Sequence, residues 1–345
     1  MSVQKHILVF RFSSLGDIAM TVPVIRLLLQ QHPQLEVTFV SVAFVRPLFN
    51  NIERLHFYAA DTKGRHRGIT GLYRLYKALN EQFTIDAVAD IHNVLRTQVL
   101  RVFFAAAGKK IAVIDKGRDE KKKLTRRQNK ILRPLKSTFQ RYADVFAALG
   151  LPIKFNIEQG IIIPQQQSDL INSYKQQGYR LVGIAPLAQY REKTYPTNKM
   201  QQVIQLLAQH KDVKIILFGG KEAAAALQQF ADIDKDKIQS LAGVMPFAEE
   251  LNAIAGLDLM VSMDSANMHL ASMYGVPVVS IWGGTHPYLG FYGWGQVLSN
   301  AVQVQLDCRP SSVFGNKPCP RGDLACMERI APLMVYNKIC NALHL

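Results

Sequence analysis

Short runs of β-branched and other apolar residues alternate along this chain with longer segments whose apolar residues recur every three or four positions. The runs are typical of buried strands, and the longer segments are typical of amphipathic helices. Strands that follow one another through crossover helices pair in parallel. The pattern therefore predicts an α/β protein built on parallel sheets.

The first half of the chain contains one complete series of these elements. In its first helix Ile18, Val22, Ile25 and Leu29 share a face, and Leu72, Leu75, Tyr76 and Leu79 share a face in a later one. The predicted strands are 7–10, 36–40, 56–59, 85–89 and 110–114. This series predicts a first doubly wound sheet.

The pattern breaks at 150–178, where Pro152, Pro164 and the glutamines 165–167 predict a linker, and then it restarts. The second series consists of strands 181–185, 214–218, 259–263 and 277–281, with a helix that carries Met200, Val203, Ile204 and Leu207 on one face. We divide the chain into domains 1–165 and 166–345, with the option that the last helix packs back on the first. Two Rossmann-like sheets are expected to face a cleft at their strand carboxyl ends.

Composition narrows the class of protein. With 345 residues, 48% apolar and 19% charged, the chain is an ordinary globular protein rather than a disordered one. It has no run of about 18 apolar residues and no signal-peptide core, so a cytoplasmic location is expected. Neither a G-x-G-x-x-G loop after the first strand nor a P-loop motif occurs, which disfavours nicotinamide dehydrogenases and P-loop NTPases.

The four cysteines lie within the last 38 residues, but none forms a C-x-x-C pair. They are Cys308, Cys319, Cys326 and Cys340. A metal site would be expected to use such a pair, so no metal is assigned and free thiols are expected.

Asp17 follows the first strand in the segment Arg11–Asp17 (RFSSLGD) and is expected at the N-cap of the first helix. Helix capping is the ordinary role of such a residue. However, the carboxylate also stands at a strand's carboxyl end, where it could accept a proton from a substrate hydroxyl. Both roles remain open at this point.

A second polar segment, 264–269 (DSANMH), follows the strand 259–263. Small residues at a helix N-terminus leave backbone N–H groups available to an anion, and His269 is expected on the same helix face as Ser265. A structural histidine is the alternative, but this combination favours a phosphate contact.

Four segments, in order along the chain, resemble glycosyltransferase family 9, the ADP-heptose:lipopolysaccharide heptosyltransferases. They are 11–17 (RFSSLGD), 193–196 (KTYP), 264–271 (DSANMHLA) and 277–283 (PVVSIWG). The resemblance implies a GT-B fold with an N-terminal acceptor domain and a C-terminal nucleotide-sugar domain. It also implies inverting sugar transfer without a metal or other cofactor.

The resemblance implies a role for individual residues. Asp17 would be the general base for the acceptor hydroxyl. The donor would be bound by Lys193 at its phosphates, Glu222 at its ribose, Met245 at its nucleoside, and Asp264, Ser265, Ala266 and His269 at its diphosphate and sugar. This sequence departs from the family pattern at Ala266, where glycine is usual, at Leu187 and Ala188, which replace hydroxyl residues, and at Ser311, which replaces a cysteine.

The net charge of +15 predicts an anionic partner, and two-thirds of it lies between Lys109 and Arg141, with 13 Lys and Arg against 3 Asp and Glu. The resemblance implies an ADP-sugar donor and a phosphorylated glycolipid acceptor in an anionic inner-membrane leaflet. The basic residues expected to contact the acceptor or the membrane surface are Lys121, Lys122, Lys123, Arg126 and Arg127. A solvated loop is the alternative.

Two other functions are alternatives to sugar transfer. A nucleotide-sugar epimerase can share the GT-B architecture but needs no separate acceptor base. A nucleic-acid-binding protein would suit the basic charge. It is disfavoured because Phe139 is the only aromatic residue in the basic stretch and no helix-turn-helix or RNP-like pattern occurs.

Overall fold

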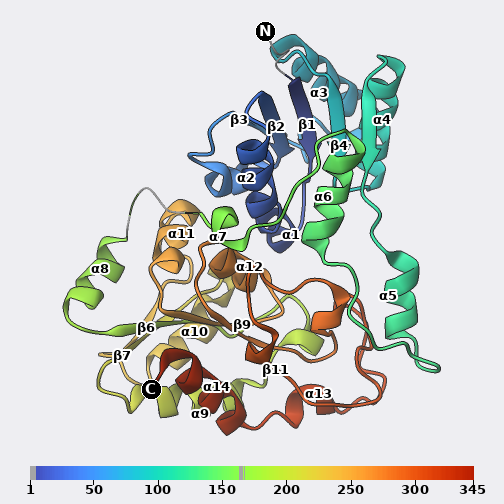
Figure 1. Ribbon diagram of the computed structural model, residues 1–345. Helices are drawn as coiled ribbons and strands as arrows, with labels where there is room; N and C mark the ends of the chain where they lie inside the picture. Colours follow the sequence, from blue (N-terminus) through green and yellow to red (C-terminus); the bar gives the residue numbers. More distant parts are fainter. Residues whose placement is uncertain (1–4, 163–165, 167) are drawn as a thin grey trace. The chain divides into compact units, whose positions relative to one another are not determined.

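The computed structural model describes residues 5–162, 166 and 168–345 (Figure 1). Of the predicted linker 150–178, Pro164, Gln165 and Gln167 lie outside these residues, and so does the position after which the sequence division falls, residue 165. The chain forms two compact units, one made of the residues up to Lys116 with Thr138–Gly160, and the other of Gly117–Ser137 with the residues from Ile161 onward. The segment 117–137 therefore packs with the second unit, although the sequence division put it in the first domain.

The first unit is a five-stranded parallel sheet in the order β3-β2-β1-β4-β5. Its strands are β1 (Lys5–Phe10), β2 (Leu35–Ser41), β3 (Leu55–Ala59), β4 (Ala87–Asp90) and β5 (Lys110–Val113). Its helices are α1 (Leu15–Ala19), α2 (Thr21–Gln31), the 3-10 helix η1 (Ala43–Phe49), α3 (Gly68–Gln82), α4 (Leu95–Ala106), α6 (Thr138–Ala148) and α7 (Ile157–Gly160).

Both faces of the first sheet are covered, which explains why its central strand is a continuous apolar run. In β1 the side chains of Leu8 and Phe10 join a core with Leu75 and Leu79 of α3 and Phe104 of α4. Helices α2 and α6 pack together on the other face, with α7 against α2.

The second unit is a six-stranded parallel sheet in the order β11-β10-β9-β6-β7-β8. Its strands are β6 (Arg180–Ala185), β7 (Val213–Leu217), β8 (Ile238–Ser240), β9 (Leu259–Met263), β10 (Val278–Ile281) and β11 (Ala301–Val302). Its α-helices are α5 (Arg118–Thr125), α8 (Asp169–Gln176), α9 (Thr197–Ala208), α10 (Ala224–Ala231), α11 (Phe247–Ala255), α12 (Ala266–Met273), α13 (Ala325–Glu328) and α14 (Pro332–Leu343). Its 3-10 helices are η2 (Arg191–Lys193), η3 (Lys221–Ala223), η4 (Pro287–Leu289) and η5 (Leu298–Asn300).

Helices α9, α10 and α14 share one face of the second sheet, and α11 and α12 lie on the other. The last helix packs on α9 and the second sheet, where Val335, Ile339 and Leu343 join the core. No described helix is both long and apolar enough to span a membrane.

The prediction of two doubly wound parallel sheets is confirmed. In each sheet the first strand of the series is central and the chain then winds outward in both directions. The strand order reverses between β1 and β4 in one sheet and between β6 and β9 in the other. Ligands of open α/β sheets bind at the carboxyl ends of strands beside such a reversal point.

Candidate active site

Asp17 lies beside the reversal point of the first sheet, in the short helix that follows β1. The helix begins at Leu15 with Ser14 as its N-cap, so Asp17 is in the first turn and is not the N-cap that the sequence predicted. Its carboxylate Oδ2 accepts from the Ser14 hydroxyl at 2.8 Å and lies 2.6 Å from Arg11 Nη2. The Asp17 side chain is 28% exposed, so the carboxylate is held on one side and open to solvent on the other.

The guanidinium of Arg11 is itself fixed by the backbone. Its Nε donates to the Ser13 carbonyl and its Nη1 to the Ile91 carbonyl beyond β4, both at 2.8 Å. Its plane also lies over the ring of Tyr142, 5.9 Å from the ring centre, and the Tyr142 hydroxyl donates to the Asp17 carbonyl. Arg11 thus links the ends of β1 and β4 and sets the position of the Asp17 carboxylate.

His92 is buried behind this pair, in the loop after β4. Burial lowers its pKa to about 3, with a further contribution from the Arg11 charge, so the ring is neutral at pH 7. Its Nδ1 accepts from the Phe12 N–H at 3.3 Å, which leaves the hydrogen on Nε2, 3.4 Å from the Ser13 hydroxyl. No motif in the sequence marks this histidine.

The reversal point of the second sheet carries an ion pair between Lys193 and Asp264. Lys193 is the last residue of η2, in the connection after β6, and Asp264 directly follows β9. These strands are neighbours, and Lys193 Nζ lies 3.0 Å from Asp264 Oδ2. The Asp264 side chain is almost fully buried, at 6% exposed, while that of Lys193 is 16% exposed. The two residues that the sequence assigned to the donor phosphates are therefore in contact.

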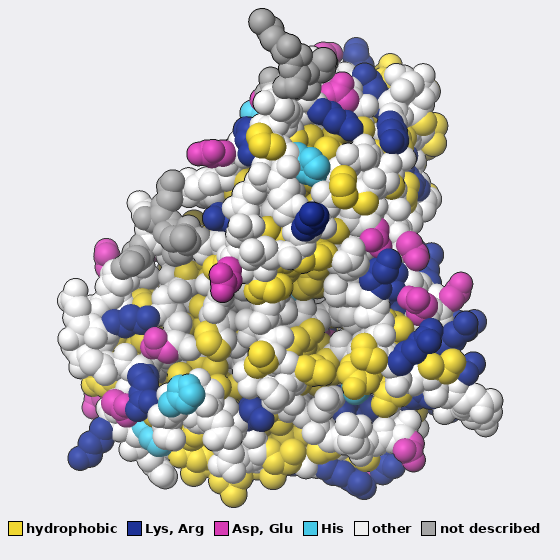
Figure 2. All heavy atoms as spheres, viewed as in Figure 1, with side chains coloured by type: hydrophobic (Ala, Val, Ile, Leu, Met, Phe, Trp, Pro, Cys, Tyr) yellow, Lys and Arg dark blue, Asp and Glu magenta, His cyan; other side chains and the backbone are white. Residues whose placement is uncertain are grey.

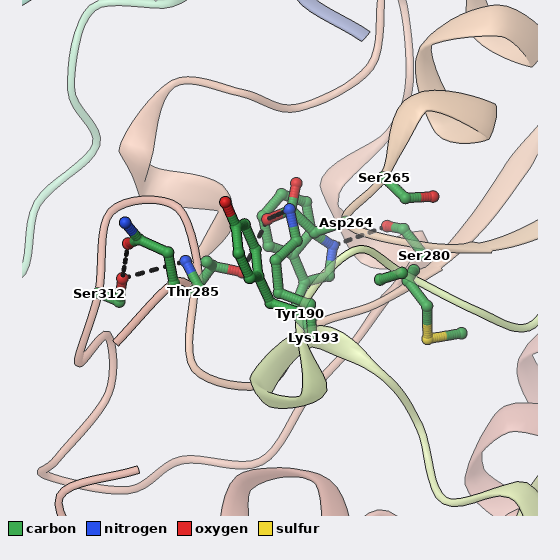
Figure 3. Close-up of polar contacts among 12 residues, drawn as sticks. Tyr190, Lys193, Asp264, Ser265, Ser280, Thr285 and Ser312 are labelled. Atoms are coloured by element: carbon green, nitrogen blue, oxygen red, sulfur yellow. Dashed lines mark hydrogen bonds and ion pairs between the residues drawn. The ribbon is translucent and has the colours of Figure 1, made fainter. Parts of the chain in front are cut away.

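Thr285, in the loop after β10, completes this arrangement (Figure 3). Its hydroxyl donates to the same Asp264 Oδ2 at 2.8 Å, and the residue is fully buried. Ser265 and Ser280 lie on the other side of Asp264 in Figure 3. The Ser265 hydroxyl is hydrogen-bonded to the Ser262 hydroxyl, and the Ser280 hydroxyl accepts from the Trp282 indole N–H. Asp264 therefore has a lysine and a hydroxyl on one oxygen, and its carboxylate is fixed from two different loops.

Two further residues that the sequence analysis missed shape the surroundings of Lys193. Arg309 is buried, and it donates to the carbonyls of Trp282, Gly283 and Thr285, so it fixes the loop that carries Thr285. Gly315 has φ +73°, and a Cβ there would overlap the side chain of Lys193. Both act through loops that come together only in the folded chain.

Glu222 and Met245 follow β7 and β8, on the other side of β6. Glu222 is exposed in η3, and Met245 is half-buried in the loop after β8. The two loops touch, because Gly243, with φ +67°, packs against Lys221. The residues assigned to the nucleoside thus extend along the same sheet edge as Lys193 and Asp264.

The residues of the DSANMH segment after Asp264 form the start of helix α12. Ser265 is its N-cap and Ala266 its first residue, so Ala266 stands where backbone N–H groups are not yet committed to the helix. His269 lies one turn later and is buried, with 7% of its surface exposed. The helix is buried from Met268 to Met273, whereas Ala266 and Asn267 at its start are partly exposed.

The five basic residues assigned to the acceptor or membrane do not share one environment. Lys122, Lys123, Arg126 and Arg127 are exposed on α5 and the segment after it. Lys121 is buried, and its Nζ lies 4.4 Å from the centre of the Phe291 ring. Lys121 therefore packs α5 onto the second unit, while the other four are available at the surface.

The C-terminal cysteines are all free thiols. Within the part of the chain that the structure describes, no group of three or more His, Cys, Asp and Glu side chains is arranged to hold a metal ion.

Two doubly wound parallel sheets in one chain are the architecture of GT-B glycosyltransferases. The chain belongs to glycosyltransferase family 9, the heptosyltransferase family, whose model matches residues 72–317. It is an enzyme of the glycosyltransferase class.

Known relatives agree with this assignment. The chain is 21% identical to the lipopolysaccharide core heptosyltransferase OpsX of Haemophilus influenzae, over 82% of this chain and 80% of that protein. Its fold is similar to that of a family 9 glycosyltransferase from Veillonella parvula, with TM-score 0.78, 18% identity, and coverage of 100% of this chain and 98% of that one. It is also similar to the E. coli heptosyltransferase WaaC solved with ADP, with TM-score 0.65, 19% identity, and coverage of 98% and 99%.

Proposed function

We propose that this enzyme transfers heptose, or a related sugar, from an ADP-linked donor to the inner core of a lipopolysaccharide-type glycolipid. The observation that carries the proposal is the fixed Lys193–Asp264 pair at the reversal point of the second sheet. The name of the Haemophilus relative supports a lipopolysaccharide acceptor, and the ADP in the WaaC structure supports an ADP-linked donor.

In the proposed reaction the acceptor hydroxyl oxygen attacks the anomeric carbon of the donor sugar. The bond from that carbon to the phosphate oxygen breaks, ADP leaves with the electron pair, and the configuration inverts. Asp17 accepts the proton of the hydroxyl, a role that suits a partly exposed carboxylate oriented by Arg11 and Ser14. A single base on the attacking face is what an inverting transfer requires.

The leaving diphosphate gains negative charge as the bond breaks. We assign its stabilisation to Lys193, His269 and the first N–H groups of α12, in place of a metal ion. Asp264 holds Lys193 before the donor arrives and, with Ser265 and Ala266, borders the diphosphate and sugar. Glu222 and Met245 are assigned to the ribose and the nucleoside.

The test is a transfer assay with ADP-heptose and a lipopolysaccharide acceptor that lacks the heptose. Asp17→Asn should lower kcat by about 10² to 10⁴, the usual contribution of a general base, while protection against thermal unfolding by ADP stays as in the wild type. Asp119→Asn, which alters an exposed carboxylate in the first turn of α5, is the matched control.

Two outcomes would contradict the proposal. Turnover of Asp17→Asn within a few-fold of the wild type would reduce Asp17 to a structural residue. Protection by UDP or GDP but not by ADP would assign a different donor.

A further inference from the structure

Two adjacent apolar residues, Ile131 and Leu132, are exposed on the segment that follows α5. Their exposed fractions are 42% and 46%. The segment is nevertheless held in place, because the Ile131 N–H donates to the Lys123 carbonyl and the Leu135 N–H to the Tyr288 carbonyl, at 3.3 and 2.9 Å. The pair is thus presented to solvent by a fixed backbone.

A second set of contacts holds the base of the segment. Lys130 Nζ donates to the carbonyls of Asp307 and Pro310, at 2.9 and 3.0 Å. Together with Lys121 over the Phe291 ring, these contacts attach both α5 and the segment to the second unit. Burying Ile131 and Leu132 in a partner would therefore require little ordering of the backbone.

The apolar pair is surrounded in sequence by exposed cations (Figure 2). Figure 2 shows Lys and Arg side chains gathered where α5 and the following segment lie, with apolar atoms among them. Four of the exposed cations form no ion pair with any carboxylate of the described residues: Lys122, Lys123, Arg127 and Arg133. The Nε of Arg126 donates to the neutral Asn129 carbonyl, so that charge is not neutralised there.

We propose that this surface, Lys122–Arg133, docks on a bilayer of anionic phospholipid, with Ile131 and Leu132 inserted at the headgroup boundary and the cations among the phosphates. Apolar side chains between basic ones are the chemistry of interfacial membrane binding. A protein partner is disfavoured because two projecting side chains bury far less than the roughly 800 Å² per partner of a specific protein interface. The bilayer needs no complementary shape. The inference extends the proposed function, since it supplies the surface in which a lipid-anchored acceptor lies.

Binding to vesicles tests the proposal without any sugar transfer. The full chain is floated with vesicles of phosphatidylcholine and phosphatidylglycerol (3:1), or of phosphatidylcholine alone, at 50 and 500 mM NaCl. We expect binding to the anionic vesicles at low salt, at least tenfold weaker binding at 500 mM NaCl, and no binding to the neutral vesicles.

The variant Ile131→Gln/Leu132→Gln should bind the anionic vesicles about tenfold more weakly than the wild type, because the apolar contribution is lost while the charge is kept. Val297→Gln/Leu298→Gln is the matched control. That pair is at least as exposed, at 58% and 47%, but no charged residue occurs between positions 290 and 306. The control should bind as the wild type does.

A gain-of-signal variant keeps the test valid if the glutamine variant folds poorly. The native Trp282 and Trp294 are buried, so Leu132→Trp adds the one exposed indole of the described residues. Its emission should shift to the blue on anionic vesicles and be quenched by brominated lipid, whereas Leu298→Trp should show neither effect.

The inference is overturned if the Ile131/Leu132 variant binds as tightly as the wild type, or if Leu132→Trp gives no blue shift. A chain that transfers sugar to a detergent-solubilised acceptor but binds no anionic vesicles would refute the docking surface and leave the proposed function standing. Vesicle binding as expected, without sugar transfer, would refute the proposed function alone.

Discussion

At the scale of single residues, the Thr285 hydroxyl donates a hydrogen bond to Asp264 Oδ2, the same oxygen that forms the ion pair with Lys193. One carboxylate oxygen thus receives both a charge-assisted contact and a neutral hydrogen bond. If the hydroxyl were removed, the carboxylate would be free to rotate and Lys193 would lose its fixed position. Thr285 is therefore expected to position Lys193 without touching the donor itself.

Thr285→Val should raise the KM for the donor by about tenfold, because a hydrogen bond to a charged group contributes roughly 1.5–3 kcal/mol and part of that reaches Lys193. Thr285→Ser keeps the hydroxyl and should restore most of the loss. Steady-state kinetics with the donor varied give the measurement. Equal KM values for the two variants, with only the melting temperature changed, would show that Thr285 acts in packing alone.

His92 makes stability depend on pH in a predictable direction. Its folded pKa of about 3 lies below the roughly 6.5 of an unfolded histidine, so the unfolded chain binds the proton first as the pH falls. The contribution of His92 is complete above about pH 6.5 and is lost progressively toward pH 3. Folding should therefore weaken in this window.

The variant His92→Gln cannot take up this proton. Its free energy of unfolding should fall less steeply between pH 6 and pH 4 than that of the wild type, by up to about 1.4 kcal/mol per pH unit. Urea unfolding at a series of pH values measures the two slopes. Parallel slopes would mean that the acid sensitivity of the fold arises elsewhere.

At the scale of elements, α5 contains two lysines with opposite environments. Lys121 is 7% exposed and lies over the Phe291 ring, while its neighbour Lys122 is exposed. Lys121→Gln should lower the free energy of unfolding by about 1–2 kcal/mol, from the lost cation–π contact and the packing of the stem. Lys122→Gln should change it by no more than about 0.5 kcal/mol. Equal midpoints in urea would contradict the packing role of Lys121.

The elements of the two sheets could largely be predicted from the apolar pattern, since a strand buried on both faces is a continuous apolar run. The strands β8 (Ile238–Ser240) and β11 (Ala301–Val302) were missed because they are short edge strands of three and two residues. The first helix was predicted as one element, but it is divided at Met20 into α1 and α2.

The site could be predicted only where its residues lie in one continuous motif. Asp264 directly follows β9 and Asp17 lies in the first turn of the helix after β1, so their place at a sheet edge could be derived from the sequence. Thr285, Arg309 and Gly315 come from loops whose meeting with Lys193 depends on tertiary packing, and no local pattern marks them. The burial of Lys121 was missed for the same reason, because its partner ring is far along the chain.

At the scale of the whole molecule, the chain passes between the two units three times, after Lys116, Ser137 and Gly160. Each unit contains a segment, 117–137 or 138–160, that continues into the other unit at both ends, so unfolding one unit releases both ends of a segment folded in the other. We expect the two units to unfold in a single cooperative transition.

Tryptophan fluorescence can test this prediction. Both tryptophans, Trp282 and Trp294, are in the second unit, whereas far-UV circular dichroism reports helices and strands of both. The two signals should give the same urea midpoint, and ADP should shift both together. A tryptophan transition that is separated from the circular dichroism transition would mean that the units unfold independently.

Residues 117–137 belong to the second unit although they precede the last segment of the first, and this order affects folding during synthesis. Lys121 and Leu135 leave the ribosome long before Phe291 and Tyr288, the residues that they contact in the finished protein. At 5–20 residues per second, the wait for about 150–170 residues is on the order of 10–30 seconds. During that time the first unit can already form its sheet, since Thr138–Gly160 belongs to it. The basic segment is then a loop closed at both ends on a folded unit until the second sheet emerges.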